Sequence, residues 1–356
     1  MWPYWILFAF FAAGALLAGP DLRRSKPLGV PLLFGALAIV IFVGLRYKTG
    51  TDWGNYQRQW VEAESLTLDS LITIHNGDAG FYTLMWLLKS AGAEYWVLNL
   101  ICAAIFTFGL FAFAKRLPNP WLAIAVAVPY LVIVIAMSAT RQATALGFVF
   151  LALIAFSKRK TPAFLGWSAA ATLFHASAIL TLPFAGLSFA RTRFQALLLV
   201  LAIVLLAWFT LGSPLEMYSI RYFNETVQST GLLYRVAMNS LAALLYFLII
   251  RPRVGLEEHE RSLWRNYSLF ALAALAVAAV VPTSTALDRA LIYLFPMQIF
   301  VLSMIPYVVQ RGGTPVLPIA AILLYLAAIL FVFMSFGVNA ESYIPYRIYW
   351  LSSGGL

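Results

Sequence analysis

The stretch LGVPLLFGALAIVIFVGL at residues 28–45 runs directly into RYKTGTDWGNY at residues 46–56. The first part has the length and polarity of a membrane-spanning helix. The second part holds two cations, one carboxylate, two glycines and three aromatic residues. Because charges are costly at bilayer depth, those at a membrane boundary are either anchors or parts of a site. The glycines at positions 50 and 54 favour a shaped loop over a frayed helix end, so this junction predicts a polar site on a membrane scaffold.

The whole chain has the composition of a membrane protein. Of its 356 residues, 62% are hydrophobic and 11% are charged, whereas soluble domains carry about a quarter charged residues. Repeated apolar runs of roughly 17–22 residues predict an all-α integral membrane protein, because a barrel would show alternating strands of about ten residues. The net charge of +10 comes from cations in short loops, so no nucleic-acid partner is expected. Cys102 is the only cysteine, which excludes an intrachain disulfide and a cysteine-based zinc site.

The apolar runs predict about ten crossings within a single polytopic domain of residues 1–356. The stretch 162–190 is too short for two full crossings, and it is either one long tilted helix or a re-entrant pair of half-helices that meet near His175. The crossings are predicted at 2–19, 28–45, 95–114, 120–138, 142–157, 194–211, 233–250, 266–282, 289–308 and 315–336.

The distribution of charge favours the re-entrant pair. With it, 15 of the 24 lysines and arginines and 4 of the 14 acidic residues fall on the cytoplasmic side, a net +11 inside and −1 outside. A single crossing at 162–190 would flip the later loops and remove this bias, against the positive-inside rule. The basic loops 23–26, 115–116 and 158–160 are then cytoplasmic. Both termini, the loops 46–80 and 212–232 and the tail 337–356 lie outside, so any chemistry is expected to face outward.

Arginines at the outer boundary are candidate anion-binding groups. Arg141-Gln142 separates two apolar runs, where the arginine is either an anchor that reaches toward water or a bidentate phosphate ligand. Asp288-Arg289 precedes another apolar run, four residues before Tyr293, and is either an ion pair at a helix start or a second phosphate-binding arginine.

The candidate bases are Asp52, Asp78 and His175. A lone histidine in an apolar stretch is either a hydrogen-bonded core residue or a catalytic group, and Asp78 is either a helix N-cap or a base. The tail from Tyr343 to Trp350 is aromatic-rich, which is typical both of an interfacial belt and of a platform for sugar rings. No nucleotide-binding loop, dinucleotide fingerprint, HExxH or Asp-x-Asp motif is present, so nucleotide- or zinc-dependent chemistry is not expected.

The order of these motifs resembles the EpsG family of exopolysaccharide polymerases, which are related in role to the Wzy polymerases. The family often has a glutamate shortly before its Gly-aromatic pair, where this chain has Asp78. The resemblance rests on Arg46 with Gly50-Thr51-Asp52-Trp53 and Tyr56, then Gly80-Phe81, Arg141-Gln142, Phe174-His175-Ala176-Ser177, Asp288-Arg289 with Tyr293, and Pro345-Tyr346-Arg347.

The resemblance implies a polymerase with a fold like the GT-C multi-span glycosyltransferases, located in the bacterial cytoplasmic (inner) membrane with its site facing the periplasm. It would move a glycan from a polyprenyl-diphosphate carrier to a hydroxyl of another lipid-linked repeat, with no cofactor and no metal. Lipid-linked oligosaccharide, membrane lipid and other polysaccharide export proteins are the implied partners. A transporter or flippase of lipid-linked sugars and a glycan ligase are the alternatives. The implied roles are catalysis for Asp52, Asp78 and His175; diphosphate binding for Arg46, Arg141, Arg289 and Arg347; and substrate binding for Trp53, Tyr56, Gln142, Tyr293 and Tyr346.

Overall fold

The computed structural model describes residues 1–18, 29–75, 77–189, 192, 194–195, 231–280, 285–310 and 315–352. Within these ranges the chain is helical and has no β-strand, apart from an isolated antiparallel bridge between Arg46 and Ile348. The all-α prediction is confirmed for this part of the chain. Three predicted segments lie wholly or mostly outside the described residues. They are the basic loop 23–26, the crossing 194–211 from residue 196 onward, and the loop 212–232 as far as residue 230.

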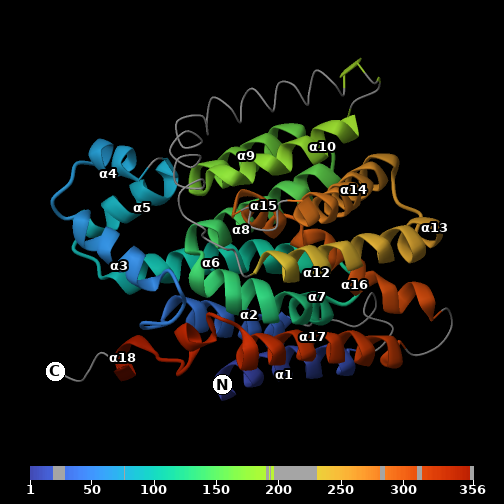
Figure 1. Cartoon of the computed structure of the whole chain (residues 1–356), viewed down its shortest axis with the longest axis horizontal. Helices are drawn as coiled ribbons and strands as arrows, with labels where there is room; N and C mark the ends of the chain where they lie inside the picture. Colours follow the sequence, from blue (N-terminus) through green and yellow to red (C-terminus); the bar gives the residue numbers. More distant parts are fainter. Residues whose placement is uncertain are drawn as a thin grey trace.

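Twenty-one helical elements follow one another in the described residues, with η1 and η3 π-helical and η2 and η4 of the 3₁₀ type (Figure 1). They are α1 (Trp2–Leu17), α2 (Gly29–Gly44), α3 (Trp53–Glu62), α4 (Leu68–Ile74), α5 (Ala79–Ser90), α6 (Tyr95–Ala114), α7 (Pro120–Ala127), η1 (Val128–Ala136), α8 (Thr140–Ser157), α9 (Thr161–Phe174), η2 (Ala176–Thr181), α10 (Leu182–Phe189), α12 (Leu232–Leu245), η3 (Tyr246–Ile250), α13 (Arg251–Arg253), α14 (Glu258–Val280), α15 (Thr285–Ile292), α16 (Phe295–Val309), α17 (Val316–Phe336), η4 (Ala340–Tyr343) and α18 (Tyr349–Ser352).

Several of these helices make the chain a multi-pass membrane protein. Within the described residues, five stretches are long and apolar enough to cross a membrane: Tyr95–Ala114, Thr140–Ser157, Leu232–Arg253, Leu287–Val309 and Val316–Phe336. Shorter apolar helices occupy Trp2–Leu17, Gly29–Gly44, Pro120–Ala136 and Ala176–Ser188. Residues 266–280 of the predicted crossing 266–282 form the second part of α14, whose first turns carry Glu258 and Glu260. The predicted crossing at 289–308 is interrupted by a turn at 293–294, between α15 and α16.

The centre of the bundle is the α7–η1 segment. Every residue of α7 is buried, and so are nearly all those of η1. A helix that is apolar on all sides is stable only when other helices surround it, and α1, α6, α16 and α17 pack around α7.

The polar groups of interest gather at one end of this bundle. In Figure 1 this end, at the left, carries α3, α4, α5 and α18, while α13 lies at the opposite end. At the opposite end the α8–α9 turn contacts the start of α14. Arg159 forms an ion pair with Glu257 at 2.9 Å, and the Ser157 hydroxyl donates a hydrogen bond to Glu260.

The helix break predicted near His175 is present. α9 packs along α8, with Phe174 beside Phe148 and Phe164 beside Phe156, so it runs back toward the start of α8. His175 then has an extended backbone, with φ −157° and ψ 118°. The chain continues through η2 into α10, which packs along α14. Asn266 on α14 donates a hydrogen bond to the backbone oxygen of Phe184 on α10 at 3.1 Å. His175 is therefore the apex of a helical hairpin.

The segment 46–80, predicted as a loop outside the membrane, is mostly helical. α3 and α4 occupy most of it, and α5 begins at its end. The sequence periodicity of these short helices is amphipathic, and they bury their apolar faces in a small core of their own that includes Tyr56, Trp60, Leu71 and Phe81. Burial against neighbours, more than local propensity, stabilises helices of this length.

The turn before α3 is fixed between the tail and η1. Gly50 has φ +98°, and its N–H donates to the Ser342 oxygen at 2.8 Å. A Cβ at this position would come within 2.0 Å of the Met137 oxygen. The shaped loop predicted from the glycines is present at Gly50, whereas Gly54 lies inside the first turn of α3 with no atom within 4 Å of an added Cβ.

Candidate functional site

Asp78, Arg141 and His175 meet at the end of the bundle that carries α3, α4 and α5. They come from the start of α5, the start of α8 and the α9–η2 apex. The Asp78 Oδ2 atom lies 2.9 Å from Arg141 Nη1 and 2.9 Å from His175 Nδ1, and its Oδ1 accepts the Ala176 N–H at 2.8 Å. Three predicted site residues, far apart in the sequence, therefore share one carboxylate.

Asp78 does not cap its own helix. It occupies the N-cap position of α5 with a left-handed backbone (φ 53°, ψ 44°), but its side chain makes no capping hydrogen bond. The interpretation of Asp78 as a side-chain cap of α5 is therefore wrong, although the residue occupies the N-cap position. Burial alone would raise the pKa of this carboxyl, but His175, Arg141 and the Ala176 N–H outweigh it and hold the pKa below its usual range. Asp78 is an ionised acceptor with both oxygens in use.

The contact with Asp78 fixes the orientation of the His175 ring. A carboxylate accepts a hydrogen bond from Nδ1–H, which makes Nε2 the basic nitrogen of the neutral ring. Nε2 is buried, and none of the described residues makes a hydrogen bond to it. The arrangement resembles the pair in which a buried aspartate orients a histidine base.

Arg141 lies among aromatic rings and is not a simple interfacial anchor. Its guanidinium carbon is 5.7 Å from the ring centre of Tyr56, 6.0 Å from that of Phe81 and 5.6 Å from that of Tyr82. Nη1 also donates to the Tyr82 hydroxyl at 3.1 Å. Tyr82 was missed by the sequence prediction, although a signal existed: it follows Asp78 by four residues at a helix start, so both share a face.

Asp52 is a half-buried carboxylate close to several arginines. It precedes α3, and its N–H lies 3.3 Å from Ser138 Oγ. Burial raises the pKa of this carboxyl, while the positive charges of Arg141, Arg289 and Arg46 act against the rise. Asp52 is therefore a carboxylate with raised basicity in a strongly positive surrounding, which suits proton transfer next to an anion.

A family model describes most of the chain. The EpsG family model matches residues 30–348, a range that includes every candidate site residue from Arg46 to Arg347. The chain belongs to the EpsG family. The family is associated with exopolysaccharide polymerase and glycosyltransferase activity. No curated protein and no solved structure matches the chain.

Arg46 of this EpsG-family chain lies inside the protein. Its side chain is 1% exposed. Nη1 donates to the Val43 oxygen at 2.6 Å and Nη2 to Thr140 Oγ1 at 2.8 Å, which ties the end of α2 to the start of α8. The guanidinium acts on Asp52 through its charge, and we assign Arg46 to positioning and not to direct substrate contact.

The other predicted residues divide between the site and its support. Arg289 is half-buried on α15 and its charge acts on Asp52 and His175. Arg347 is exposed in the tail, where its backbone oxygen accepts the Tyr47 N–H at 2.9 Å. Tyr346 stacks on Phe42 at 4.3 Å and donates to the Phe42 oxygen at 3.0 Å, so its ring supports the fold.

The remaining three predicted substrate-binding side chains are buried to different degrees. Trp53 is half-buried, with its ring edge-on to Tyr95 at 5.7 Å. Gln142 is buried at the start of α8, and Tyr293 is fully buried in the turn after α15. No group of three or more His, Cys, Asp or Glu side chains in the described part of the chain is placed to hold a metal ion.

Asp288 has a partner that the sequence did not indicate. Its carboxylate pairs with Nη1 of Arg235 on α12, and Arg235 Nε–H donates to the Tyr130 hydroxyl on η1. Arg235 was missed because it lies inside a predicted crossing, yet an arginine in such a position is itself a signal of function.

Proposed function

We propose that the protein is a polysaccharide polymerase that transfers a glycan from a polyprenyl-diphosphate carrier to a hydroxyl of another lipid-linked repeat unit. The observation that carries this proposal is the position of Asp52 at one end of an apolar bundle. Burial raises the pKa of its carboxyl, and the positive charges of Arg141 and Arg289 act on it. A substrate that is anionic at the membrane surface and apolar below it fits such an end.

The leaving group sets the first requirement. When the bond from the sugar C1 to the diphosphate oxygen breaks, the bonding electrons stay on the diphosphate. Arg141 and Arg289 would hold that charge, because guanidinium groups bind phosphates through paired N–H donors. Arg141 is held in place for this by Asp78, by Tyr82 and by the surrounding rings.

The acceptor hydroxyl sets the second requirement. Its oxygen forms the new bond to C1 and its proton must pass to a base. Both oxygens of Asp78 are engaged, so Asp78 is assigned to orienting His175 and Arg141. We assign the base to Asp52 and a hydrogen bond to the same hydroxyl to His175 Nε2.

The surroundings of the reaction follow from the arrangement of the chain. We place the site on the periplasmic face of the bacterial cytoplasmic membrane, within one polytopic domain of the GT-C type. The predicted charge distribution supports this orientation. Membrane lipid and other polysaccharide export proteins are the proposed partners, and the re-entrant pair centred on His175 would carry the histidine to the membrane surface.

The test uses the purified full chain in liposomes with a lipid-linked repeat unit and no nucleotide sugar, and it follows product length on gels. Wild-type protein should make glycans of increasing length. Arg141→Ala and Asp52→Asn should slow elongation by about 10²–10³-fold, while Arg58→Ala, which removes an exposed outer arginine, should leave it unchanged.

Three outcomes would overturn the proposal. Unchanged product length in both site variants would refute the assignment of Arg141 to diphosphate binding and of Asp52 as the base. Transfer of a finished chain to a different acceptor would show a ligase. Movement of the lipid-linked repeat across the membrane without elongation would show a transporter.

A further inference from the structure

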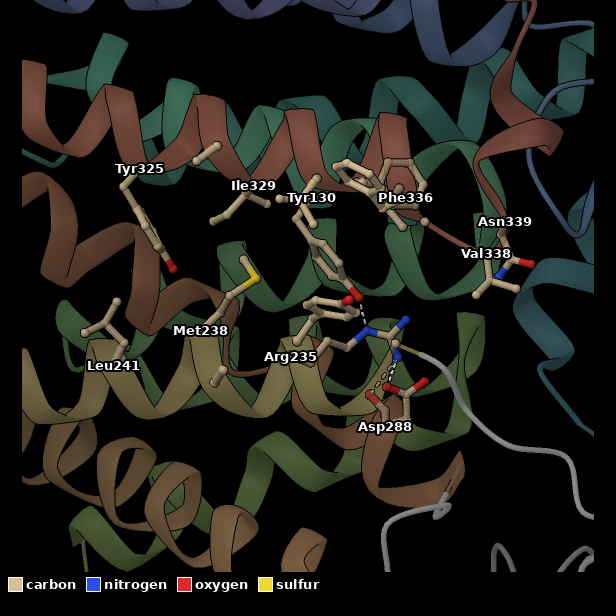
Figure 2. A pocket seen from close by; sticks show the side chains of 18 residues that line it. Tyr130, Arg235, Met238, Leu241, Asp288, Tyr325, Ile329, Phe336, Val338 and Asn339 are labelled. Carbon is tan, nitrogen blue, oxygen red and sulfur yellow. Dashed lines mark hydrogen bonds and ion pairs between the residues drawn. The ribbon is translucent and has the colours of Figure 1, made fainter.

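A second site lies apart from the Asp78 cluster, in a cavity of about 660 Å³ between α12 and α17. Both helices pack on α16, and η1 and α15 complete the walls. Figure 2 shows Arg235 and Asp288 toward one end of this groove and Leu241 and Tyr325 toward the other. A volume between about 300 and 1,000 Å³ suits one small ligand or one segment of a larger one.

The polar end of the groove is built around Arg235. Its side chain is 13% exposed and that of Asp288 is 11% exposed. Nε–H donates to the Tyr130 hydroxyl, and Nη1 pairs with the Asp288 carboxylate. The Tyr130 ring stacks on Phe295 at 4.8 Å. Nη2 lies beside Gly231 and has no hydrogen-bond partner among the described residues, so this oriented guanidinium keeps donors for an anion.

The rest of the groove is apolar and extends toward the middle of the bundle. Along α17 the lining runs from Phe336 to Tyr325, about 16 Å at the rise of an α-helix. On α12 it continues over Met238 and Leu241. Phe336 is 72% exposed and Leu241 is 39% exposed, so the groove opens sideways at the surface that faces lipid. A cation at one end and a lateral apolar channel below it match a phosphate-bearing lipid.

The chemistry of the proposed function requires such a second site, and this step rests on that function. The donor must present its diphosphate beside the base, because the bond that breaks joins the diphosphate to C1. The acceptor instead presents a hydroxyl that is separated from its own diphosphate by the sugars of the repeat. Its lipid therefore needs an anion site and an apolar channel of its own. Asp288 faces the groove while the next residue, Arg289, acts on Asp52, so α15 connects the two sites.

We propose that the groove between α12 and α17 binds the polyprenyl diphosphate of the acceptor repeat, with Arg235 as its phosphate ligand. Asp288 neutralises Arg235 while the groove is empty and holds the guanidinium in its orientation. A bound phosphate brings negative charge next to that carboxylate. Removing the charge of Asp288 should therefore strengthen binding, and removing that of Arg235 should weaken it.

The first experiment maps where the lipid binds. The full chain in nanodiscs is labelled with a polyprenyl diphosphate that carries a photoreactive group near its first isoprene units, and labelled peptides are identified by mass spectrometry. Labelling is expected on α12 and α17 as well as near the Asp78 cluster. Ala328→Trp fills the groove and should abolish labelling of α17, while Leu324→Trp, on the exposed side of the same helix, should not. Labelling confined to the Asp78 cluster, or α17 labelling that survives Ala328→Trp, would overturn the proposal.

The second experiment tests the charges. Competition of unlabelled polyprenyl diphosphate against the probe gives an apparent affinity for the α17 label. Arg235→Gln should weaken it by about tenfold to a hundredfold, the loss expected for one charged hydrogen-bonding group. Asp288→Asn should tighten it. Equal losses in both variants would show that the ion pair serves only the fold and would refute the assignment.

Neither measurement needs turnover, which separates the two proposals. If elongation is absent but groove labelling responds as described, the acceptor site stands as a lipid site and the polymerase function fails. If elongation is present and Ala328→Trp leaves the KM for the acceptor unchanged, the function stands and the groove assignment fails.

Discussion

Replacement of Asp78 by Asn should remove the contact that holds three segments of the chain together. The asparagine amide keeps one oxygen, which can still accept the Ala176 N–H. Its NH₂ group then faces two other donors, Arg141 Nη1 and His175 Nδ1–H, in a place where the carboxylate now accepts both at 2.9 Å. The negative charge that offsets Arg141 is lost as well.

The magnitude follows from the burial of the partners. The Asp78 side chain is 7% exposed and that of Arg141 is 24% exposed. Breaking a fully buried ion pair by removing one partner costs about 3–5 kcal/mol. Because Arg141 retains some contact with water, we expect the lower end, a loss of about 3 kcal/mol in the free energy of unfolding.

The assay is a titration of the detergent-solubilised protein with SDS, followed by tryptophan fluorescence and circular dichroism. Asp69→Asn is the matched control, because Asp69 is an exposed carboxylate on the same segment, 46–80. It should change the free energy of unfolding by less than about 1 kcal/mol. If Asp78→Asn unfolds within 0.5 kcal/mol (about the spread of ordinary surface substitutions) of wild type, the carboxylate does not stabilise the cluster and the geometric argument is refuted.

The pH dependence of stability gives the same prediction a second test. The pKa of Asp78 is depressed in the folded protein, so its stabilisation is fully present above the unfolded value of about 3.9 and is lost as the pH falls through the lower folded value. Wild-type protein and Asp78→Asn should therefore differ at neutral pH and converge in acid below about pH 4. A difference that stays constant well below that pH would contradict an ionised Asp78.

Three further predictions concern the turn before α3 and its neighbours. Gly50→Ala should destabilise the protein by more than about 1–2 kcal/mol, because its φ of +98° and the Met137 oxygen leave no place for a Cβ. Its control, Gly54→Ala, should be neutral or stabilising by up to about 1 kcal/mol. Equal effects of the two substitutions in SDS titration would show that the backbone at Gly50 does not require glycine. Asp52→Asn should slow elongation by about 10²–10³-fold yet raise stability at neutral pH, because burial penalises the charged carboxylate; a less stable variant would reverse that sign. Arg141→Lys should fail to restore elongation, because an ammonium cannot reproduce the planar contacts with aromatic rings and carboxylate; wild-type rates would show that charge alone suffices.

Composition and residue order were sufficient to predict a helical membrane protein and to select the candidate site residues. Apolar runs predict helices because every backbone group must be satisfied within the segment in lipid, and α6 and α17 match the predicted crossings within a residue. Polar residues beside such runs are few, so Asp78, Arg141 and His175 could each be selected without knowing that they touch.

Helix interruptions and the segment 46–80 were harder to predict. The π-helical η1 and η3 and the turn at 293–294 lie inside uniformly apolar runs, where hydropathy gives no sign of a change in winding. The helices α3 and α4 were not predicted, because each is short and partly polar. Their stability comes from the apolar cluster that they share with α5, and this contact is not visible along the chain.

The amino-acid sequence by itself determined that this protein is a helical membrane protein of the EpsG family with its unusual polar residues near the ends of apolar runs. Tertiary structure alone decided which of those residues meet. It placed Asp78 against Arg141 and His175, buried Arg46 inside the protein, and paired Asp288 with Arg235 at one end of a lateral groove. The physical reason is that the residue type sets how much hydration free energy a polar group loses when it is buried. Which partner offsets that loss depends on which helices pack together.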